Sequence, residues 1–312
     1  MNITRSKTMK KMIAVTTLSA TLGIAMMGGE YAPLVNAAAA SIVTNVGSVF
    51  KISDSPTLKD VLQQGLSSAP NQAVTHDGVT LILTDLIYDG NELVMGIRQE
   101  GGTVKKDKNI LDTGKLDTSA NGKKMYYNTS VSSLSEDPDA ALIRLSKGVV
   151  KQQITDEFEL TLKAYVREVE EPFIFTIPVK KVASLISITP GTTKKSGKFS
   201  YTVTSFQMTP LTMQLQISYK GEFPAAVKKH HKLLYDLVDE KGNVFSPNGS
   251  DNQPSKTGKD EQNYGSFVTV PQSITIKPFI YKLDAKGQLF KDTTGKWAKS
   301  YYKDLELKIY QR

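Results

Sequence analysis

The sequence has 312 residues and contains no cysteine, a single tryptophan and three histidines. The absence of cysteine excludes thiol catalysis, cysteine-ligated zinc or iron–sulfur sites, disulfide bonds and a lipid-modified N-terminal cysteine. The Gly-x-Ser-x-Gly and His-Glu-x-x-His motifs and a glycine-rich phosphate loop are also absent. These absences remove several common classes of catalytic site.

The three histidines do not suggest a metal site. His76 precedes the dipeptide Asp77-Gly78, which is typical of a tight turn, so we expect His76 to face solvent. His230 and His231 stand among lysines, whose positive charge disfavours a bound cation. Adjacent strand residues also point to opposite faces, so this pair is not expected to share one metal ion.

Two groups of carboxylates lie beside prolines, where we expect solvated turns. They are Glu168, Glu170 and Glu171 before Pro172, and Glu136, Asp137 and Asp139 around Pro138. A general acid needs an apolar pocket that raises its pKa, which turns rarely provide. We therefore predict no catalytic residue, no cofactor-binding residue and no metal ligand, and we predict that the chain is not an enzyme.

One metal alternative remains open, because oxygen-rich turns can hold Ca²⁺ even without an EF-hand pattern. The turns concerned contain Asp89, Asn91 and Glu92, or Asp137 and Asp139.

The charge of the chain argues against nucleic acid as a partner. The net charge is +8, of which the four basic residues and one acidic residue within 1–40 account for +3, leaving +5. The remaining lysines are interspersed with Asp and Glu and form no basic stripe. Such a mild positive bias is compatible with loose association with anionic wall polymers or lipid headgroups.

Residues 1–40 have the three parts of an export signal. Basic residues from Arg5 to Lys11 precede sixteen uncharged residues, Met12 to Met27, and small residues follow from Val35 to Ala40. Cleavage after Ala37 or Ala39 would fit. The alternative is an uncleaved membrane anchor, although sixteen helical residues span about 24 Å of a roughly 30 Å hydrocarbon core. We expect the remaining chain to be extracytoplasmic, either secreted or anchored by this single helix.

Beyond residue 40, the pattern predicts two β-sandwich domains, at 41–181 and 182–312. Ser55-Pro56 opens one short helix at about 56–66, whose apolar residues share a face. Elsewhere apolar and polar residues alternate with the period of strands. We expect strands at 79–88, 93–98, 140–145, 158–166, 173–179, 212–219, 233–238, 267–270, 274–281 and 305–310. The fold class is mainly β, with immunoglobulin-like sandwiches after the signal or anchor helix.

Two polar segments, Gly101 to Asn121 and Asn248 to Asn263, are expected to be long surface loops, the first with a weak hairpin, and both are candidate binding sites. Unpaired sheet edges are the other candidates. Trp297, the single tryptophan, is expected to be a packing anchor rather than a ligand platform.

Most of the exported chain resembles the extracytoplasmic part of Bacillus- and Paenibacillus-type envelope proteins that are anti-sigma-factor-like. The resemblance lies in Ile42 to Phe50, Asp77 to Leu81, Leu86 to Leu93, Pro172 to Val179, Gly295-Lys296-Trp297 and Tyr301-Tyr302. It implies a domain of unknown function followed by an immunoglobulin-like domain. The family usually has a tryptophan where this chain has Pro172-Phe173. The short segment before the apolar run also lacks room for the cytoplasmic sigma-binding part, so we expect any regulatory role to need a partner.

Three functions remain open. The first is a non-enzymatic envelope protein that binds or senses a cell-wall polymer, a peptide or another envelope protein, with membrane contact only through an uncleaved N-terminal segment. The second is a structural or adhesive surface protein. The third is a secreted hydrolase whose site is assembled from distant residues, which a deep pocket with convergent carboxylates would support.

Overall fold

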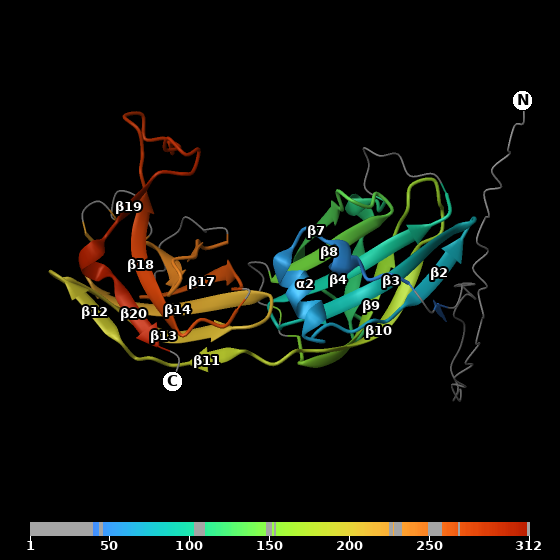
Figure 1. The fold of residues 1–312 in the computed structure, drawn as a ribbon, viewed down its shortest axis with the longest axis horizontal. Helices are drawn as coiled ribbons and strands as arrows, with labels where there is room; N and C mark the ends of the chain where they lie inside the picture. The colour runs from blue at the N-terminus through green and yellow to red at the C-terminus, as the bar shows by residue number, and fades with distance from the viewer. Residues whose placement is uncertain are drawn as a thin grey trace, which may run out of the picture.

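The computed structural model describes residues 40–43, 46–102, 110–147, 152, 154–224, 227, 233–248, 258–267 and 269–310. Residues 1–39, which hold nearly all of the expected signal or anchor, lie outside this part of the chain. In the part that is described, no helix is both long and apolar enough to cross a membrane. Figure 1 shows two groups of strands arranged end to end.

The N-terminal sandwich consists of two antiparallel sheets from residues 41 to 180. One has the order β1-β2-β3-β4-β8-β7 and the other β10-β9-β5-β6. The strands are β1 Ser41–Ile42, β2 Gln72–His76, β3 Val79–Tyr88, β4 Glu92–Glu100, β5 Asp117–Ala120, β6 Lys123–Lys124, β7 Tyr127–Ser133, β8 Ala140–Lys147, β9 Glu157–Ala164 and β10 Phe173–Lys180.

The C-terminal sandwich, residues 186 to 310, also has two sheets. One has the order β11-β13-β14-β17, with β12 on β13, and the other β16-β15-β18-β19, with β20 on β18. The strands are β11 Ile186–Ile188, β12 Thr193–Ser196, β13 Phe199–Met208, β14 Thr212–Gly221, β15 Leu234–Asp239, β16 Val244–Phe245, β17 Lys259–Gly265, β18 Ser273–Tyr281, β19 Lys299–Tyr301 and β20 Leu307–Tyr310.

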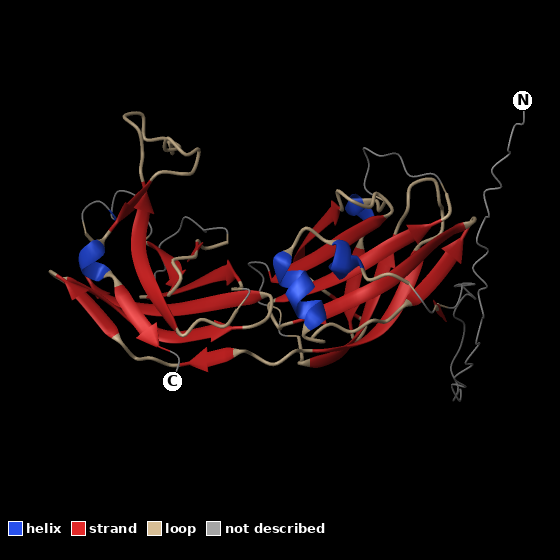
Figure 2. Cartoon of the chain, in the orientation of Figure 1, coloured by secondary structure: helices blue, strands red, loops and turns tan. Residues whose placement is uncertain are grey.

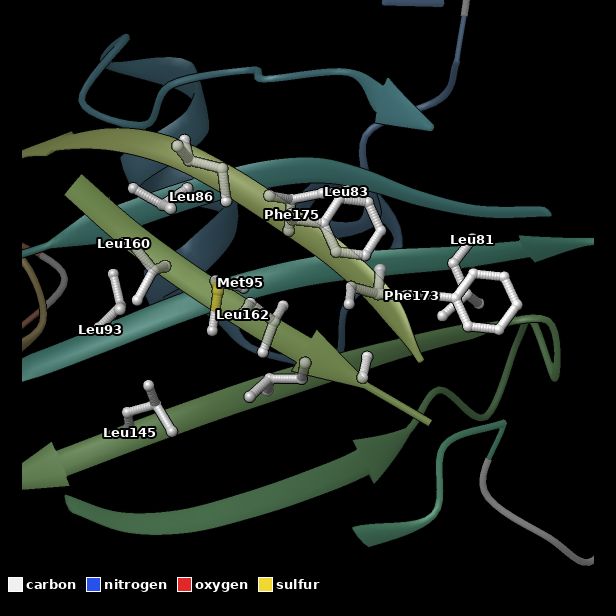
Figure 3. Packing of buried hydrophobic residues seen from close by; sticks show 14 of the residues in the cluster. Leu81, Leu83, Leu86, Leu93, Met95, Leu145, Leu160, Leu162, Phe173 and Phe175 are labelled. Atoms are coloured by element: carbon white, nitrogen blue, oxygen red, sulfur yellow. The ribbon is translucent and has the colours of Figure 1, made fainter. Parts of the chain in front are cut away.

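Each sandwich encloses its own apolar core. In the N-terminal sandwich, Leu83 and Met95 of one sheet face Leu160 and Phe175 of the other, and all four are buried (Figure 3). A second cluster, including Phe206, fills the C-terminal sandwich. The inward faces are therefore occupied by packed side chains, and the predicted mainly-β fold of two sandwiches is confirmed.

The predicted helix is present as α2, Pro56–Gln63, and ends three residues earlier than expected. The Ser55 hydroxyl accepts a hydrogen bond from the Leu58 N–H, and Pro56 occupies the first turn. A shorter helix, α1 Val49–Ile52, precedes it. Figure 2 shows both helices against the first sheet, where their buried side chains form a cluster on its outer face. The described part of the chain also contains two 3-10 turns, Thr113–Lys115 and Lys303–Leu305.

The prediction of surface loops at Gly101 to Asn121 and at Asn248 to Asn263 is wrong in part. Within Gly101 to Asn121, Ile110 and Leu111 are buried in the core and β5 pairs with β9. Residues 103–109 lie outside the described part. Within Asn248 to Asn263, the last residues form β17, and residues 249–257 lie outside the described part.

The strand β17 was not predicted because its residues are mostly polar. Its buried Gln262 accepts a hydrogen bond from the Tyr235 N–H and donates to the Leu233 carbonyl, so a hydrogen-bonded amide occupies an inward position of this strand. The prediction of a strand at 267–270 is also wrong, because residues 267, 269 and 270 belong to no strand. Buried Phe267 joins the core from a loop.

The two sandwiches meet through their central hairpin turns. Asp89 follows β3 and is buried, and its Oδ1 accepts the N–H groups of Asn91 and Glu92 at 2.8 and 2.7 Å. Its Oδ2 accepts the hydroxyls of Thr209, in the turn between β13 and β14, and of Thr212, the first residue of β14, at 2.5 and 2.7 Å. One carboxylate thus shapes its own turn and binds the other sandwich.

Candidate functional site

A groove along the open side of the C-terminal sandwich is the candidate site. It lies between β11, the edge strand of one sheet, and β20, which pairs only with β18 in the other sheet. Within the described part of the chain, no strand pairs with the outer edge of either. Figure 1 shows β20 and β11 close together near the C-terminus. Two strand edges therefore flank one open space, and such edges offer unpaired N–H and carbonyl groups.

The groove has a volume of about 430 Å³, within the usual range for a ligand site. Its walls come from both sheets: Ser187, Ile188, Thr189, Pro190, Thr192, Lys308, Ile309 and Tyr310. Ile186, Ile188 and Ile309 also line a smaller adjoining apolar pocket. The groove thus combines hydroxyl groups, an apolar floor and one cation.

Lys308 and Tyr310 form the exposed rim of the groove. Alternation along β20 turns Ile309 inward and these two side chains outward. The Lys308 Nζ lies 5.2 Å from the centre of the Tyr310 ring, a cation–π contact. Tyr310 is 61% exposed, so its ring has apolar area to bury against a ligand.

His76 departs from the sequence expectation. Its side chain is only 10% exposed, and its Nδ1 lies 3.0 Å from a carboxylate oxygen of Glu171. The ring also packs edge-on against Phe173, with centroids 5.0 Å apart. His76 was expected to face solvent because of its turn, but β10 and the turn before it cover it. His230 and His231 lie outside the described residues.

In the turns that were left open as Ca²⁺ sites, the carboxylates accept hydrogen bonds or form ion pairs within the protein. Both oxygens of Asp89 accept the hydrogen bonds described above. Glu92 lies 3.1 Å from Arg144, and burial raises the pKa of Glu92 while that guanidinium opposes the rise. Asp137 forms a 2.7 Å ion pair with Arg98. Among the described residues, no three His, Asp or Glu side chains gather as metal ligands would.

Trp297 is not a packing anchor. Its side chain is 47% exposed, and the Lys291 Nζ lies 5.5 Å from its ring centre. It stands on a segment that leaves the sheet after β18 and returns at β19. The aromatic type of the residue suggested burial, but the sequence carried no signal that this segment projects from the sheet.

Two family models match parts of this chain. Residues 4–101 match a domain of unknown function, DUF4179, and residues 186–309 match a family of unknown function, DUF5643. Both matches support an unknown-function family. No curated protein matches the sequence.

A solved structure supports the fold. The conserved domain protein from Bacillus anthracis aligns with 86% of this chain and 99% of its own, with a TM-score of 0.54 and 14% identity. At that identity the likeness concerns the fold alone. Bovine butyrophilin aligns with 70% of this chain and 93% of its own at 9% identity, but its TM-score of 0.19 is too low to support an argument.

Proposed function

We propose that this chain is a non-enzymatic extracytoplasmic binding protein, and that the groove between β11 and β20 holds an extended peptide segment of its partner. The observation that carries the proposal is the position of the groove between two strand edges from opposite sheets. A peptide strand could add main-chain hydrogen bonds along either edge.

The side chains around the groove favour one kind of peptide. The isoleucine floor suits apolar side chains on one face of an added strand. Lys308 is the single charged residue among those that line the groove, so it favours an acidic group at the rim. We therefore infer a peptide that alternates apolar and polar residues and carries at least one carboxylate.

Features of the sequence support a location for this activity in the cell envelope. A signal or anchor in residues 1–40 would export both sandwiches, and the resemblance to anti-sigma-factor-like envelope proteins fits a role in sensing a wall component or a partner ectodomain. Any control of a sigma factor would then pass through a separate membrane partner. Nucleic acid is not among the partners that we propose.

Selection from a library of random extended peptides tests the site. We expect peptides selected on the full chain to bind about tenfold more weakly when Lys308→Glu and Tyr310→Ala are combined, because truncation of an interface aromatic commonly costs this much. Affinities would be measured by fluorescence anisotropy.

The matched control combines Lys259→Glu with Tyr126→Ala. Both residues are exposed, and Lys259 stands on β17, an edge strand of the same sandwich. The control should bind as wild type does. Equal losses in the two variants, or a selection that yields no groove-dependent peptide, would contradict the proposed site.

A further inference from the structure

The segment between β18 and β19, residues 282–298, forms an arm that stands out from the C-terminal sandwich (Figure 1). Of the ten large hydrophobic side chains exposed in the described part of the chain, three lie on this arm. Leu289 is 47% exposed, Phe290 39% and Trp297 47%. Such a concentration of exposed apolar area marks an interaction surface.

The arm is held in shape by two consecutive tight turns of the same design. Asp284 accepts the N–H groups of Lys286 and Gln288, and Asp292 accepts those of Thr294 and Lys296. Gly287 and Gly295 both adopt a φ of 79°, which favours glycine. The Lys282 N–H donates to the Ala298 carbonyl at 2.8 Å and closes the arm at its base. The apolar side chains are therefore presented by an ordered scaffold.

The charge of the arm has one predominant sign. It carries four lysines and two aspartates, Asp284 and Asp292, and all of them are exposed. Both carboxylates accept hydrogen bonds within the turns, and the Thr294 hydroxyl and N–H lower the pKa of Asp292. The arm thus has a net charge of +2, and its lysines are Lys282, Lys286, Lys291 and Lys296.

We propose that this arm docks on an anionic lipid surface, inserting Trp297, Phe290 and Leu289 at the level of the headgroups. Tryptophan with aliphatic and aromatic neighbours favours the membrane interface, and lysines beside them bind acidic headgroups while their stems cover apolar area. A projecting arm meets a deformable bilayer without needing a complementary cavity. Docking would hold the C-terminal sandwich at the membrane, independently of the peptide groove and of the N-terminal segment.

The single tryptophan makes the test specific to the arm, because all tryptophan fluorescence of the full chain comes from Trp297. Vesicles of phosphatidylcholine with phosphatidylglycerol should shift its emission to the blue. Acyl chains labelled with bromine should quench it. Vesicles of phosphatidylcholine alone should produce a much smaller effect. Residues 1–40 contain no tryptophan, so insertion of an N-terminal anchor would contribute no emission of its own.

Two variants separate the contributions of apolar area and charge. The first variant combines Leu289→Ser with Phe290→Ser, and the second combines Lys286→Glu with Lys291→Glu. Each should weaken lipid binding, so that the half-saturating lipid concentration rises about tenfold. The matched controls are Tyr126→Ser with Val244→Ser, which are 57% and 56% exposed elsewhere, and Lys59→Glu with Lys123→Glu, also exposed. Both controls should respond as wild type does, and circular dichroism would verify that every variant folds.

Three results would overturn the proposal. The first is an unchanged Trp297 emission in anionic vesicles. The second is an equal shift with neutral vesicles, which would remove the role of the lysines. The third is a shift produced by solubilised wall polysaccharide but not by vesicles, which would assign the arm to the wall instead.

Discussion

At the scale of single residues, the buried Asp85 shows how one side chain joins a helix to a sheet. A β-bulge between Leu83 and Asp85 redirects this part of β3. The Asp85 carboxylate then accepts hydrogen bonds from the Ser48 hydroxyl and the Val49 N–H, at 2.6 and 2.7 Å, at the start of α1. It also accepts the Thr84 hydroxyl at 2.7 Å. The carboxylate thereby satisfies donors that a helix leaves without partners inside the helix.

Replacement Asp85→Ala should lower the free energy of unfolding by about 3 kcal/mol, because it leaves buried N–H donors without an acceptor. Asp117→Ala is the control, since Asp117 is exposed and its carboxylate makes a 3.6 Å surface ion pair with Lys124. It should cost less than about 0.5 kcal/mol. Urea unfolding would measure both, and comparable losses would show that Asp85 has no special role.

At the scale of elements, the arm depends on how firmly its base is attached. Lys299, the first residue of β19, places its Nζ 2.8 Å from both carboxylate oxygens of Asp236 on β15. The Asp236 side chain is fully buried, and it also accepts the Tyr301 hydroxyl at 2.7 Å. The same ammonium lies 4.2 Å from the centre of the Phe279 ring. These contacts connect β19 to β15 across the intervening β18.

Lys299→Met should therefore destabilise the chain by about 3 kcal/mol, because it leaves a buried carboxylate without its cation. Lys291→Met, which changes an exposed lysine of the arm itself, should cost less than about 0.5 kcal/mol. The Lys299→Met loss should shrink when Asp236→Leu is added, as removal of the partner charge predicts. Unfolding in guanidinium chloride would measure all three, and additive losses would argue against the pairing.

At the scale of the whole molecule, the two sandwiches use equivalent hairpins at their junction. Strands β3 and β13 each have ten residues, and each has a bulge at its sixth residue, Thr84 or Thr204. Both threonine hydroxyls donate to a carbonyl on the partner strand, that of Gly96 or Gln216. The turns that follow meet through the Asp89 hydrogen bonds. Leu211, from the second turn, enters the cluster around α1 and α2.

Combining Thr209→Val with Thr212→Val should loosen this junction while leaving the backbone hydrogen bonds of Asp89 to its own turn in place. Because the chain has no cysteine, spin labels on Lys59→Cys and Lys241→Cys would report one distance between the sandwiches. Electron paramagnetic resonance should show a broader distance distribution in the variant. Thr193→Val with Thr202→Val, an exposed threonine pair within one sandwich, should leave the distribution unchanged. An unchanged distribution in the junction variant would contradict this role.

Local signals in the sequence were enough to predict the fold class and several elements. The Asp77-Gly78 dipeptide predicted a hairpin turn, and both residues have the positive φ that this turn requires. The alternating pattern of 212–219 appears within β14, and the apolar run 79–88 is β3. Each of these predictions needed only residues close together in the chain. For the groove, the sequence predicted only the kind of site, an unpaired sheet edge, and not the strands that form it.

By itself, the sequence determined that the described part of this chain forms sandwiches, because period and turn chemistry act over a few residues. Tertiary structure alone decided which side chains became buried or exposed. His76 is covered by β10 and its preceding turn, Gln262 is buried because the Leu233 and Tyr235 backbone satisfies its amide, and Trp297 is exposed because its arm leaves the sheet. These outcomes depend on segments far apart in the chain, whose contacts no local pattern specifies.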